Sequence, residues 1–317
     1  MFCCYVDEAT VFKKVKGSYV MDKETLLEKV RHSDQLPMLP DVAVRIIDMS
    51  NDRELYAAKI SEVIANDPVL SARLLQVSNS SIFPFRREIT NLNQALAILG
   101  IQLTMSIAIG FAIIDMMRSC ESKDSDFNHD AFWRKSVLGA IAAIEMRSEL
   151  NGVEQGDLFV TALMQDVGMI ALETFEGQKY TQLVNGARSH LDLLELERRM
   201  FGVDHAEIGA TILERWRLPA IHINAVRNSH YLLEAKSITE LTELEYAVAL
   251  SGMLAEQWIN ESSNQQALDD AIQRALERIG DQGYKNIINK TMDAVPDANE
   301  LFKMSLLSPE QLSNIKP

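Results

Sequence analysis

Ala162-Leu163-Met164-Gln165-Asp166-Val167-Gly168 is the stretch that decides the fold of this chain. Its apolar residues predict a helix. An apolar helix with a His-Asp pair directly before Val-Gly would present two metal ligands, but Gln165 stands in place of the histidine. A side-chain amide is a poor ligand for zinc, manganese or iron compared with imidazole, and Asp166 alone cannot hold a transition metal. The stretch therefore predicts the scaffold of a hydrolytic centre without its chemistry, which favours a binding or signalling protein.

Length and composition predict a large helical protein. The 317 residues are 47% hydrophobic, enough to bury a sizeable core in two lobes or domains. The 14 Met and only 8 Pro are typical of helices. Sustained alternation of apolar and polar residues is missing, and so are Asn-Gly turns between β-branched runs. We therefore predict an all-α fold of two packed helical lobes.

The net charge indicates which partners to expect, and the cysteine content indicates the redox environment. The net charge is −14 and the isoelectric point is about 4.9. Nucleic acids and anionic membranes both bind surfaces with clustered Lys and Arg, so neither is expected as a partner of this acidic chain. Cys3, Cys4 and Cys120 include no pair with metal-site spacing. The simplest interpretation is a reduced, cytoplasmic protein.

Two apolar segments resemble targeting or membrane signals without meeting their requirements. Residues 1–20 turn acidic after the first apolar residues, so they predict a loosely packed arm and not a signal peptide. The run Leu103–Ile114 is interrupted by Thr104, Ser106 and Gly110. It falls short of the roughly 20 apolar residues that a bilayer requires. We expect a buried core helix.

Helix start signals and one polar segment outline the domains. Asp67-Pro68 joins a capping carboxylate to a proline at the first helical position. Asp157 is expected to cap the helix that holds Gln165 and Asp166. Cys120–Asn128 is polar and acidic and is the best linker candidate. We predict three parts, which are an arm at 1–20, an N-terminal lobe at 21–120 and a C-terminal lobe at 121–317.

Several short motifs follow one another in a specific order. They are Leu36–Pro40, Asp67-Pro68, Leu74–Ser80, Ala95–Gly100, Phe132-Trp133, Ala162–Gly168, Phe201–His205 and Trp216–Pro219. Together they resemble the HDOD family, the "HD-related output domain", which is related to the HD metal phosphohydrolases and generally lacks their full ligand set. The resemblance implies a bacterial signalling or regulatory module whose C-terminal lobe is an HD-like helical bundle.

The resemblance also identifies the positions of the missing ligands. An active relative has a histidine shortly after the tryptophan, where this chain has Lys135. Gln165 replaces the second histidine, and Ser251 aligns with the last aspartate. Of the four ligand positions, only Asp166 is retained. We therefore expect a vestigial site with no catalytic residue, no metal and no cofactor.

Lys135 has two interpretations. If the helices keep the packing of the active relatives, its ammonium lies where the metal cation would be and gives Asp166 a counter-charge. Alternatively, Lys135 extends to solvent and Asp166 caps nearby donors. Loss of thermodynamic stability on Lys135→Met would separate the two.

His205 and His230 are the strongest argument for a residual metal or ligand site. Together with Asp166 they would form a two-His-one-carboxylate set. The alternative is that His205, which follows Asp204, helps a helix cap and that His230 interacts with a helix end. We expect surface positions or satisfied core positions for the other histidines, which are His32, His129, His190 and His222.

The segment Phe83-Pro84-Phe85-Arg86-Arg87 is the best candidate for a partner contact. Aromatic and guanidinium groups are the residue types that dominate interface energetics, so Phe83, Phe85, Arg86 and Arg87 are the candidate residues. The alternative is that Phe83 or Phe85 packs inside the N-terminal lobe while the arginines pair locally.

These observations favour a non-catalytic regulatory module that contacts other signalling proteins, gated by a small ligand in a vestigial cleft near Lys135, Gln165 and Asp166. One alternative is a metal-dependent phosphohydrolase or cyclic-nucleotide phosphodiesterase with an atypical site made of Asp166, His205 and His230. Another is a nucleotide receptor without turnover, in which Lys135 and nearby arginines contact phosphate.

Overall fold

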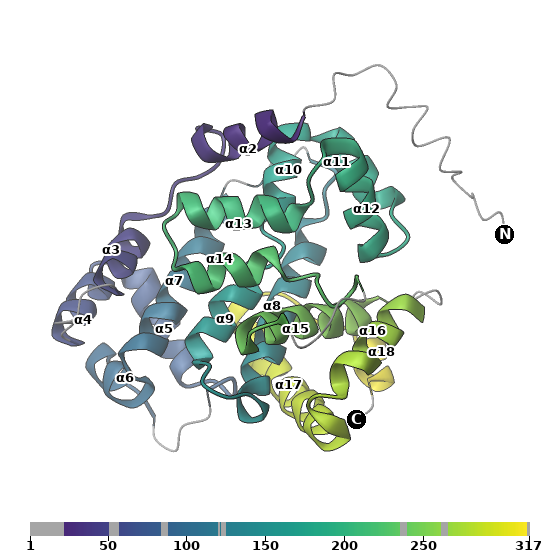
Figure 1. The fold of residues 1–317 in the computed structure, drawn as a ribbon. Helices are drawn as coiled ribbons and strands as arrows, with labels where there is room; N and C mark the ends of the chain where they lie inside the picture. The colour runs from purple at the N-terminus through teal and green to yellow at the C-terminus, as the bar shows by residue number, and fades with distance from the viewer. Residues whose placement is uncertain are drawn as a thin grey trace.

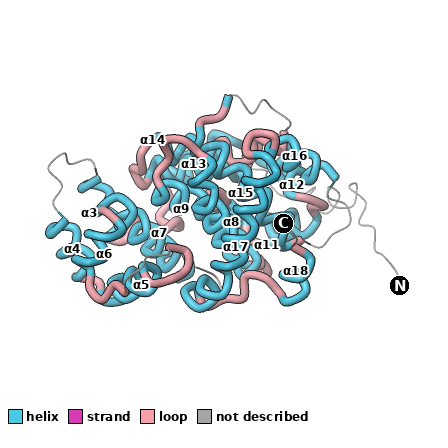
Figure 2. The backbone as a smooth tube through the Cα atoms, turned by 90° about the horizontal axis from the view of Figure 1, so that it is seen from below, coloured by secondary structure: helices cyan, strands magenta, loops and turns pink. Residues whose placement is uncertain are grey.

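The computed structural model describes residues 22–50, 57–83, 88–119, 121, 125–234, 240–260 and 266–315. Over these residues the chain forms helices joined by turns, and Figure 2 shows no strand in the same ranges. The all-α prediction is therefore confirmed. The predicted arm at 1–20 and four residues of the predicted linker at Cys120–Asn128, namely 120 and 122–124, lie outside the described residues.

Residues 22–119 contribute a group of short helices and one long one. They are α2 (Lys23–His32), α3 (Asp41–Ser50), α4 (Ala57–Ala65), α5 (Pro68–Ser78), α6 (Leu92–Leu99) and α7 (Ile101–Ser119). In Figure 1, helices α3 to α6 gather on the left of the molecule, and α7 runs from them toward the centre.

The helices from residue 129 onward form the larger bundle. Its helices are α8 (His129–Glu145), η1 (Met146–Glu149), α9 (Gln155–Met164), α10 (Gly168–Glu176), α11 (Gln178–Gly186), α12 (His190–Phe201), α13 (His205–Arg215), α14 (Ala220–Arg227), α15 (Glu243–Ile259), α16 (Gln266–Leu276), α17 (Gly280–Phe302) and α18 (Pro309–Asn314). Helices α8, α9 and α15 pack against one another at the centre of this bundle.

Helix α7 lies between the two groups, because it packs on α3 on one side and on α9 on the other. The close approach to α9 depends on Gly110, where a Cβ atom would lie 2.8 Å from the Phe159 ring. Two segments, Ile101–Ser119 and Gln155–Glu176, are long and apolar enough to cross a membrane by length and composition. They are 61% and 83% buried inside the protein, as expected for core helices. The predicted buried helix at Leu103–Ile114 is confirmed.

Helix α2 packs against α13, in the other half of the chain. The Arg215 guanidinium donates to the carbonyl oxygens of Val30 and Ser33, at 2.9 and 2.8 Å, and so satisfies the carboxyl end of α2. The domain boundaries 21–120 and 121–317 therefore stay a prediction, since the first helix of the expected N-terminal lobe contacts the other half.

The two predicted helix starts have different outcomes. Asp67 caps α5, with Oδ1 accepting hydrogen bonds from the amides of Val69 and Leu70, both at 3.0 Å. Asp157 is not a cap, because α9 already begins at Gln155 and its N-cap is Glu154. The Asp157 carboxylate instead lies in the first turn, where the helix dipole favours negative charge.

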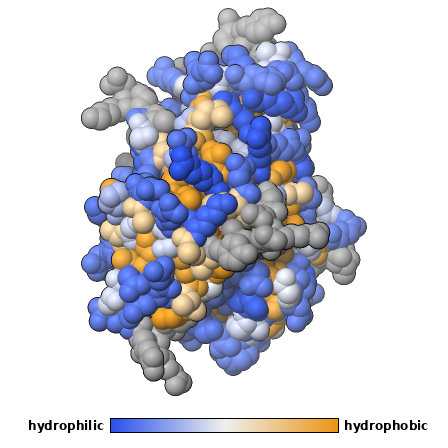
Figure 3. All heavy atoms as spheres, turned by 90° about the vertical axis from the view of Figure 1, so that its left-hand side faces the viewer, coloured by the Kyte–Doolittle hydropathy of each residue, from blue (hydrophilic) through white to orange (hydrophobic). Residues whose placement is uncertain are grey.

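The surface of the N-terminal helices carries scattered apolar patches among polar residues (Figure 3). Exposed large hydrophobic side chains on these helices include Val44, Val69 and Ile98. Phe83, by contrast, is 2% exposed and packs inside this part of the molecule. The prediction of Phe83 as a partner contact is therefore wrong, because its ring belongs to the core, and Phe85, Arg86 and Arg87 lie outside the described residues.

Candidate functional site

Gln165 and Asp166 lie in the turn between α9 and α10, and not within a helix as the sequence suggested. The turn brings both side chains to the packed centre, where each is 1% exposed. Gly168 begins α10 and permits this path, because a Cβ atom there would lie 1.9 Å from the His205 carbonyl oxygen. The start of α13 thus lies directly beside the turn that carries Asp166.

The Gln165 amide is enclosed by two glycines on α8 and α15. A Cβ atom on Gly252 would lie 2.2 Å from Gln165 Oε1, and one on Gly139 would lie 3.1 Å from Nε2. Neither amide atom has a hydrogen-bond partner among the described residues. Gln165 therefore fills the space between the helices, but its two buried polar atoms lack hydrogen bonds, which lowers the stability of the fold.

Ser251 is buried on α15, and its hydroxyl donates to the carbonyl oxygen of Val248 in its own helix, at 3.0 Å. Among the described residues this hydroxyl has no other hydrogen-bond partner. Ser251 thus forms part of the helix packing without offering a charged or ligating group to Asp166.

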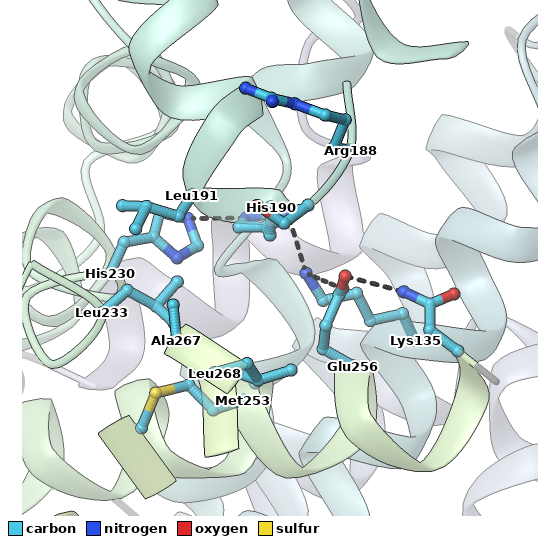
Figure 4. Close-up of a pocket in the computed structure, with 13 residues that line it drawn as sticks. Lys135, Arg188, His190, Leu191, His230, Leu233, Met253, Glu256, Ala267 and Leu268 are labelled. Atoms are coloured by element: carbon cyan, nitrogen blue, oxygen red, sulfur yellow. Dashed lines mark hydrogen bonds and ion pairs between the residues drawn. The ribbon is translucent and has the colours of Figure 1, made fainter. Parts of the chain in front are cut away.

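Lys135 on α8 reaches inward to Asp166. Its Nζ lies 3.0 Å from Asp166 Oδ2, 3.2 Å from a Glu256 carboxylate oxygen and 3.1 Å from His190 Nδ1. Figure 4 shows Lys135, Glu256 and His190 meeting from three different elements. The counter-charge interpretation of Lys135 is therefore the one found in the structure.

Burial and pairing act in opposite directions on these charges. Burial alone would lower the pKa of Lys135, but the carboxylates of Asp166 and Glu256 raise it above its ordinary value. Burial alone would raise the pKa of Asp166, but the Lys135 ammonium holds it well below its usual range. Both groups are therefore charged at neutral pH.

Three buried histidines surround the second oxygen of Asp166. The Nε2 atoms of His230, His205 and His190 lie 3.3, 3.5 and 3.8 Å from Asp166 Oδ1. His230 Nε2 is also 2.8 Å from His205 Nε2 and 3.3 Å from His190 Nε2. We call Asp166, His190, His205 and His230 the histidine cluster. Its ligand atoms all lie within 4.8 Å of one another.

The elements around the cluster explain how it forms. His190 and His205 are the first residues of α12 and α13, each directly after an N-cap residue, Ser189 or Asp204. His230 lies in the turn after α14. Three chain segments that are separate in sequence thus present one imidazole each to the turn that carries Asp166.

Glu197 fixes the orientation of the His205 ring. One carboxylate oxygen lies 2.7 Å from His205 Nδ1 and accepts from the His205 amide at 2.9 Å, and the other accepts from the Tyr180 hydroxyl at 2.6 Å. Burial would lower the pKa of His205, but the Glu197 carboxylate raises it to about 10. The contact directs His205 Nε2 toward Asp166.

The sequence grouped His205 and His230 with Asp166, and the structure places all three together. His190 was missed, since no spacing linked it to the other two. One signal was available, because His190 follows a helix cap as His205 does. His222 fulfils the satisfied-core expectation, with Nδ1 2.6 Å from the Thr161 hydroxyl, and His32 lies on the surface.

A cleft opens beside Lys135 and the histidine cluster. Its volume is about 350 Å³, and Asp166, His190 and Lys135 form part of its wall. Apolar lining comes from Phe132, Met169 and Leu193, and polar lining includes Arg188, Glu256 and Asn260. The Arg188 side chain is paired with Asp192 at 3.2 Å. The cleft thus has a mixed wall in which the cations already have carboxylate partners.

Comparison with known proteins identifies the family. A family model for the HDOD domain matches residues 36–232, which is more than half of the chain. The chain therefore belongs to the HDOD family. This agrees with the resemblance that the ordered motifs indicated.

Two solved structures have a similar fold. An HDOD domain protein of unknown function from Geobacter sulfurreducens has a TM-score of 0.66 at 22% identity, covering 89% of this chain and 99% of that one. A protein from Shewanella amazonensis SB2B, whose name proposes a phosphohydrolase, has a TM-score of 0.67 at 21% identity, covering 89% and 98%. At these identities the likeness concerns the fold alone.

A curated relative is an uncharacterised protein of Treponema pallidum (strain Nichols). It is 22% identical over 223 residues, which is 69% of this chain and 42% of the relative. The chain thus spans less than half of the length of this relative.

Proposed function

We propose that this chain is a regulatory module that acts by binding and not by hydrolysis. The observation that carries the proposal is the contact between Lys135 Nζ and Asp166 Oδ2 at 3.0 Å. At the position where an HD hydrolase has a histidine, this chain supplies a cation. A two-metal hydrolytic centre needs ligands on both sides of the shared carboxylate, and here one side is taken by an ammonium.

The other two replaced positions support the same proposal. Gln165 is enclosed between Gly139 and Gly252, and the Ser251 hydroxyl bonds within its own helix. Neither side chain offers an anionic oxygen or an imidazole to a second ion. These two positions therefore supply no ligand for a second ion that would activate the water of a hydrolase.

Regulation would use the cleft to bind a small molecule and the surface to contact other proteins. A small molecule in the cleft would contact Lys135 and the start of α12 together, and could thus shift helices that reach the surface. Exposed apolar residues on the N-terminal helices, such as Val44 and Val69, are consistent with contacts to other signalling proteins. A nucleotide receptor is less favoured, because Lys135 and Arg188 already have carboxylate partners.

Hydrolysis and binding can be measured separately on the full chain. We expect no turnover of bis(p-nitrophenyl) phosphate or cyclic dinucleotides above that of Asp166→Ala, with Mn²⁺ or Zn²⁺ present. We expect a subset of small ligands to raise the melting temperature. Turnover that disappears in Asp166→Ala would contradict the proposal and favour the phosphohydrolase alternative.

A further inference from the structure

Asp166 Oδ1 is the feature that the ion pair with Lys135 leaves unexplained. Lys135 contacts the other oxygen, Oδ2. Oδ1 is buried and has no hydrogen-bond partner among the described residues, although three imidazole nitrogens surround it. A buried carboxylate oxygen without a donor is unusual and costly, so a group that satisfies it is expected.

The distances in the histidine cluster fit a metal ion. In a tetrahedral site with metal–ligand bonds of about 2.1 Å, the ligand atoms lie about 3.4 Å apart. The three Nε2–Oδ1 distances are 3.3, 3.5 and 3.8 Å, and the His190–His230 Nε2 distance is 3.3 Å. The His205–His230 Nε2 distance is shorter, 2.8 Å, so these two rings would move apart by about 0.6 Å around an ion. We propose that the histidine cluster binds one divalent transition-metal ion of the zinc class, through Asp166 Oδ1 and the Nε2 atoms of His190, His205 and His230.

A proton network without metal satisfies the cluster less well. Lys135 Nζ donates toward His190 Nδ1, so a neutral His190 would carry its proton on Nε2. His205 donates its Nδ1 proton to Glu197, so only its protonated, imidazolium form would also direct an Nε2 proton at His230. One His230 lone pair would then accept from two donors, while Oδ1 would have only the ion pair with the His205 imidazolium, at 3.5 Å and without a well-aligned hydrogen bond. With an ion present, all four atoms have a partner.

The ring nitrogen of His205 that faces away from Asp166 has the kind of partner that metal-binding histidines have. A ligating histidine usually donates its other ring nitrogen to a carboxylate, which fixes the ring and raises its basicity. Glu197 is placed in this way at His205, and Tyr180 holds Glu197 in turn. Asp166 and His190 line the cleft, which gives an ion a route to the site.

Four protein ligands make this a closed site. Catalytic zinc sites keep a position for water, whereas structural sites fill all four positions with protein. The inference rests on the proposed function, because a closed single-ion site is consistent with binding without hydrolysis. It adds a cofactor class and a coupling between that cofactor and Lys135.

Metal binding and the contacts of Lys135 are coupled through the position of the proton on the His190 ring. When Nε2 binds an ion, Nδ1 keeps the proton of the neutral ring and cannot accept from Lys135. The ammonium then loses this contact and retains Asp166 Oδ2 and Glu256. Occupancy of the metal site thus changes the contacts of a cation that lines the cleft.

The test is calorimetric titration of Zn²⁺ into the chelator-stripped full chain. We expect one equivalent to bind, with an affinity at least about 100-fold weaker in His190→Ala, since even outer contacts are worth about 10–100-fold. Glu197→Gln should weaken binding about tenfold or more. His32→Ala is the matched control, because the His32 side chain is 75% exposed and remote from the cluster, and it should bind as the wild type does.

Lys135→Met complements the ligand variants, because its expected effect on Zn²⁺ affinity has the opposite sign and therefore cannot be produced by loss of the fold. It should bind Zn²⁺ about tenfold tighter than the wild type, because the competing contact with His190 is gone. Absence of specific binding in the wild type would overturn the inference, and binding only in Lys135→Met would show that Lys135 permanently replaces the ion. Either result leaves the proposed function standing, whereas phosphodiester turnover would contradict that function without affecting the metal site.

Discussion

At the scale of single residues, Lys135 and Asp166 form the most consequential pair in the described structure. The Asp166 side chain is 1% exposed and that of Lys135 is 14% exposed, and their charges depend on each other. A buried charge that loses its partner is far more costly than an exposed one, because water cannot replace the lost contact. The pair therefore contributes to folding as well as to the properties of the cleft.

Lys135→Met should destabilise the metal-free chain by about 3–5 kcal/mol, since Asp166 is left without a counter-charge. Denaturant unfolding in the presence of chelator measures the change. The control is Lys290→Met, because Lys290 is half-exposed and 3.9 Å from Glu145, and its loss should cost less than about 1 kcal/mol. Equal, small effects in both variants would show that the buried pair does not stabilise the fold.

His222 gives a pH dependence that is separate from the histidine cluster. Burial lowers its pKa from 6.5 to about 4. The unfolded chain therefore binds more protons than the folded chain between these values, and stability falls as the pH falls from about 6.5 toward 4. The loss is at most about 3 kcal/mol.

His222→Gln should remove this part of the pH dependence and keep a partner for Thr161. The measurement is the unfolding free energy of both proteins at pH 7 and pH 4, and the two losses should differ by up to about 3 kcal/mol. His32→Gln, at an exposed position, should follow the wild type. If His222→Gln also follows the wild type, His222 is not held neutral in the folded state.

At the scale of helices, the contact between α10 and α13 determines where the cluster lies. Gly168 is where the two helices meet, with the His205 backbone directly above it. Backbone atoms cannot rotate away as a side chain can, so any added atom must move a helix. Because His205 begins α13, such a shift also displaces a cluster residue.

Gly168→Ala should therefore destabilise the protein by about 3 kcal/mol or more, at the upper end for overpacked sites. Gly152→Ala is the comparison, because Gly152 has φ 69° and no neighbour within 4 Å of an added Cβ. It should cost only the backbone strain of about 1–2 kcal/mol. Thermal and denaturant unfolding of both variants give the values. A Gly168→Ala protein as stable as Gly152→Ala would mean that α10 and α13 can separate freely.

The helices also show which features could be predicted from the sequence. Local signals predicted the helical content, the Asp67 cap and the buried α7, because capping and apolar runs are properties of neighbouring residues. The burial of Phe83 and the packing of α2 on α13 depend on contacts between distant segments, which no local pattern contains. Lys135 and Asp166 could be paired only because the family resemblance supplied the helix packing.

At the scale of the whole molecule, α7 joins the two halves of one apolar core. The buried cluster of hydrophobic residues runs from α2 through α7 to α17 without a break. Halves that share a core in this way should lose their structure together. The position of His190 also depends on the whole fold, since it joins His205 and His230 only when three distant segments fold against one another.

We therefore expect a single cooperative unfolding transition, although the chain has 317 residues. Differential scanning calorimetry should give one peak, with equal calorimetric and van't Hoff enthalpies. Two resolved transitions would show that the residues on either side of α7 form independent domains.

The most direct measurement is anomalous diffraction at the zinc edge, on crystals of the full chain grown with Zn²⁺. A single peak among Asp166, His190, His205 and His230, with Lys135 still beside Asp166, is the predicted result. Two peaks sharing the Asp166 carboxylate, about 3.5–4 Å apart, would be the arrangement of a two-metal hydrolase and would contradict a non-hydrolytic, closed site.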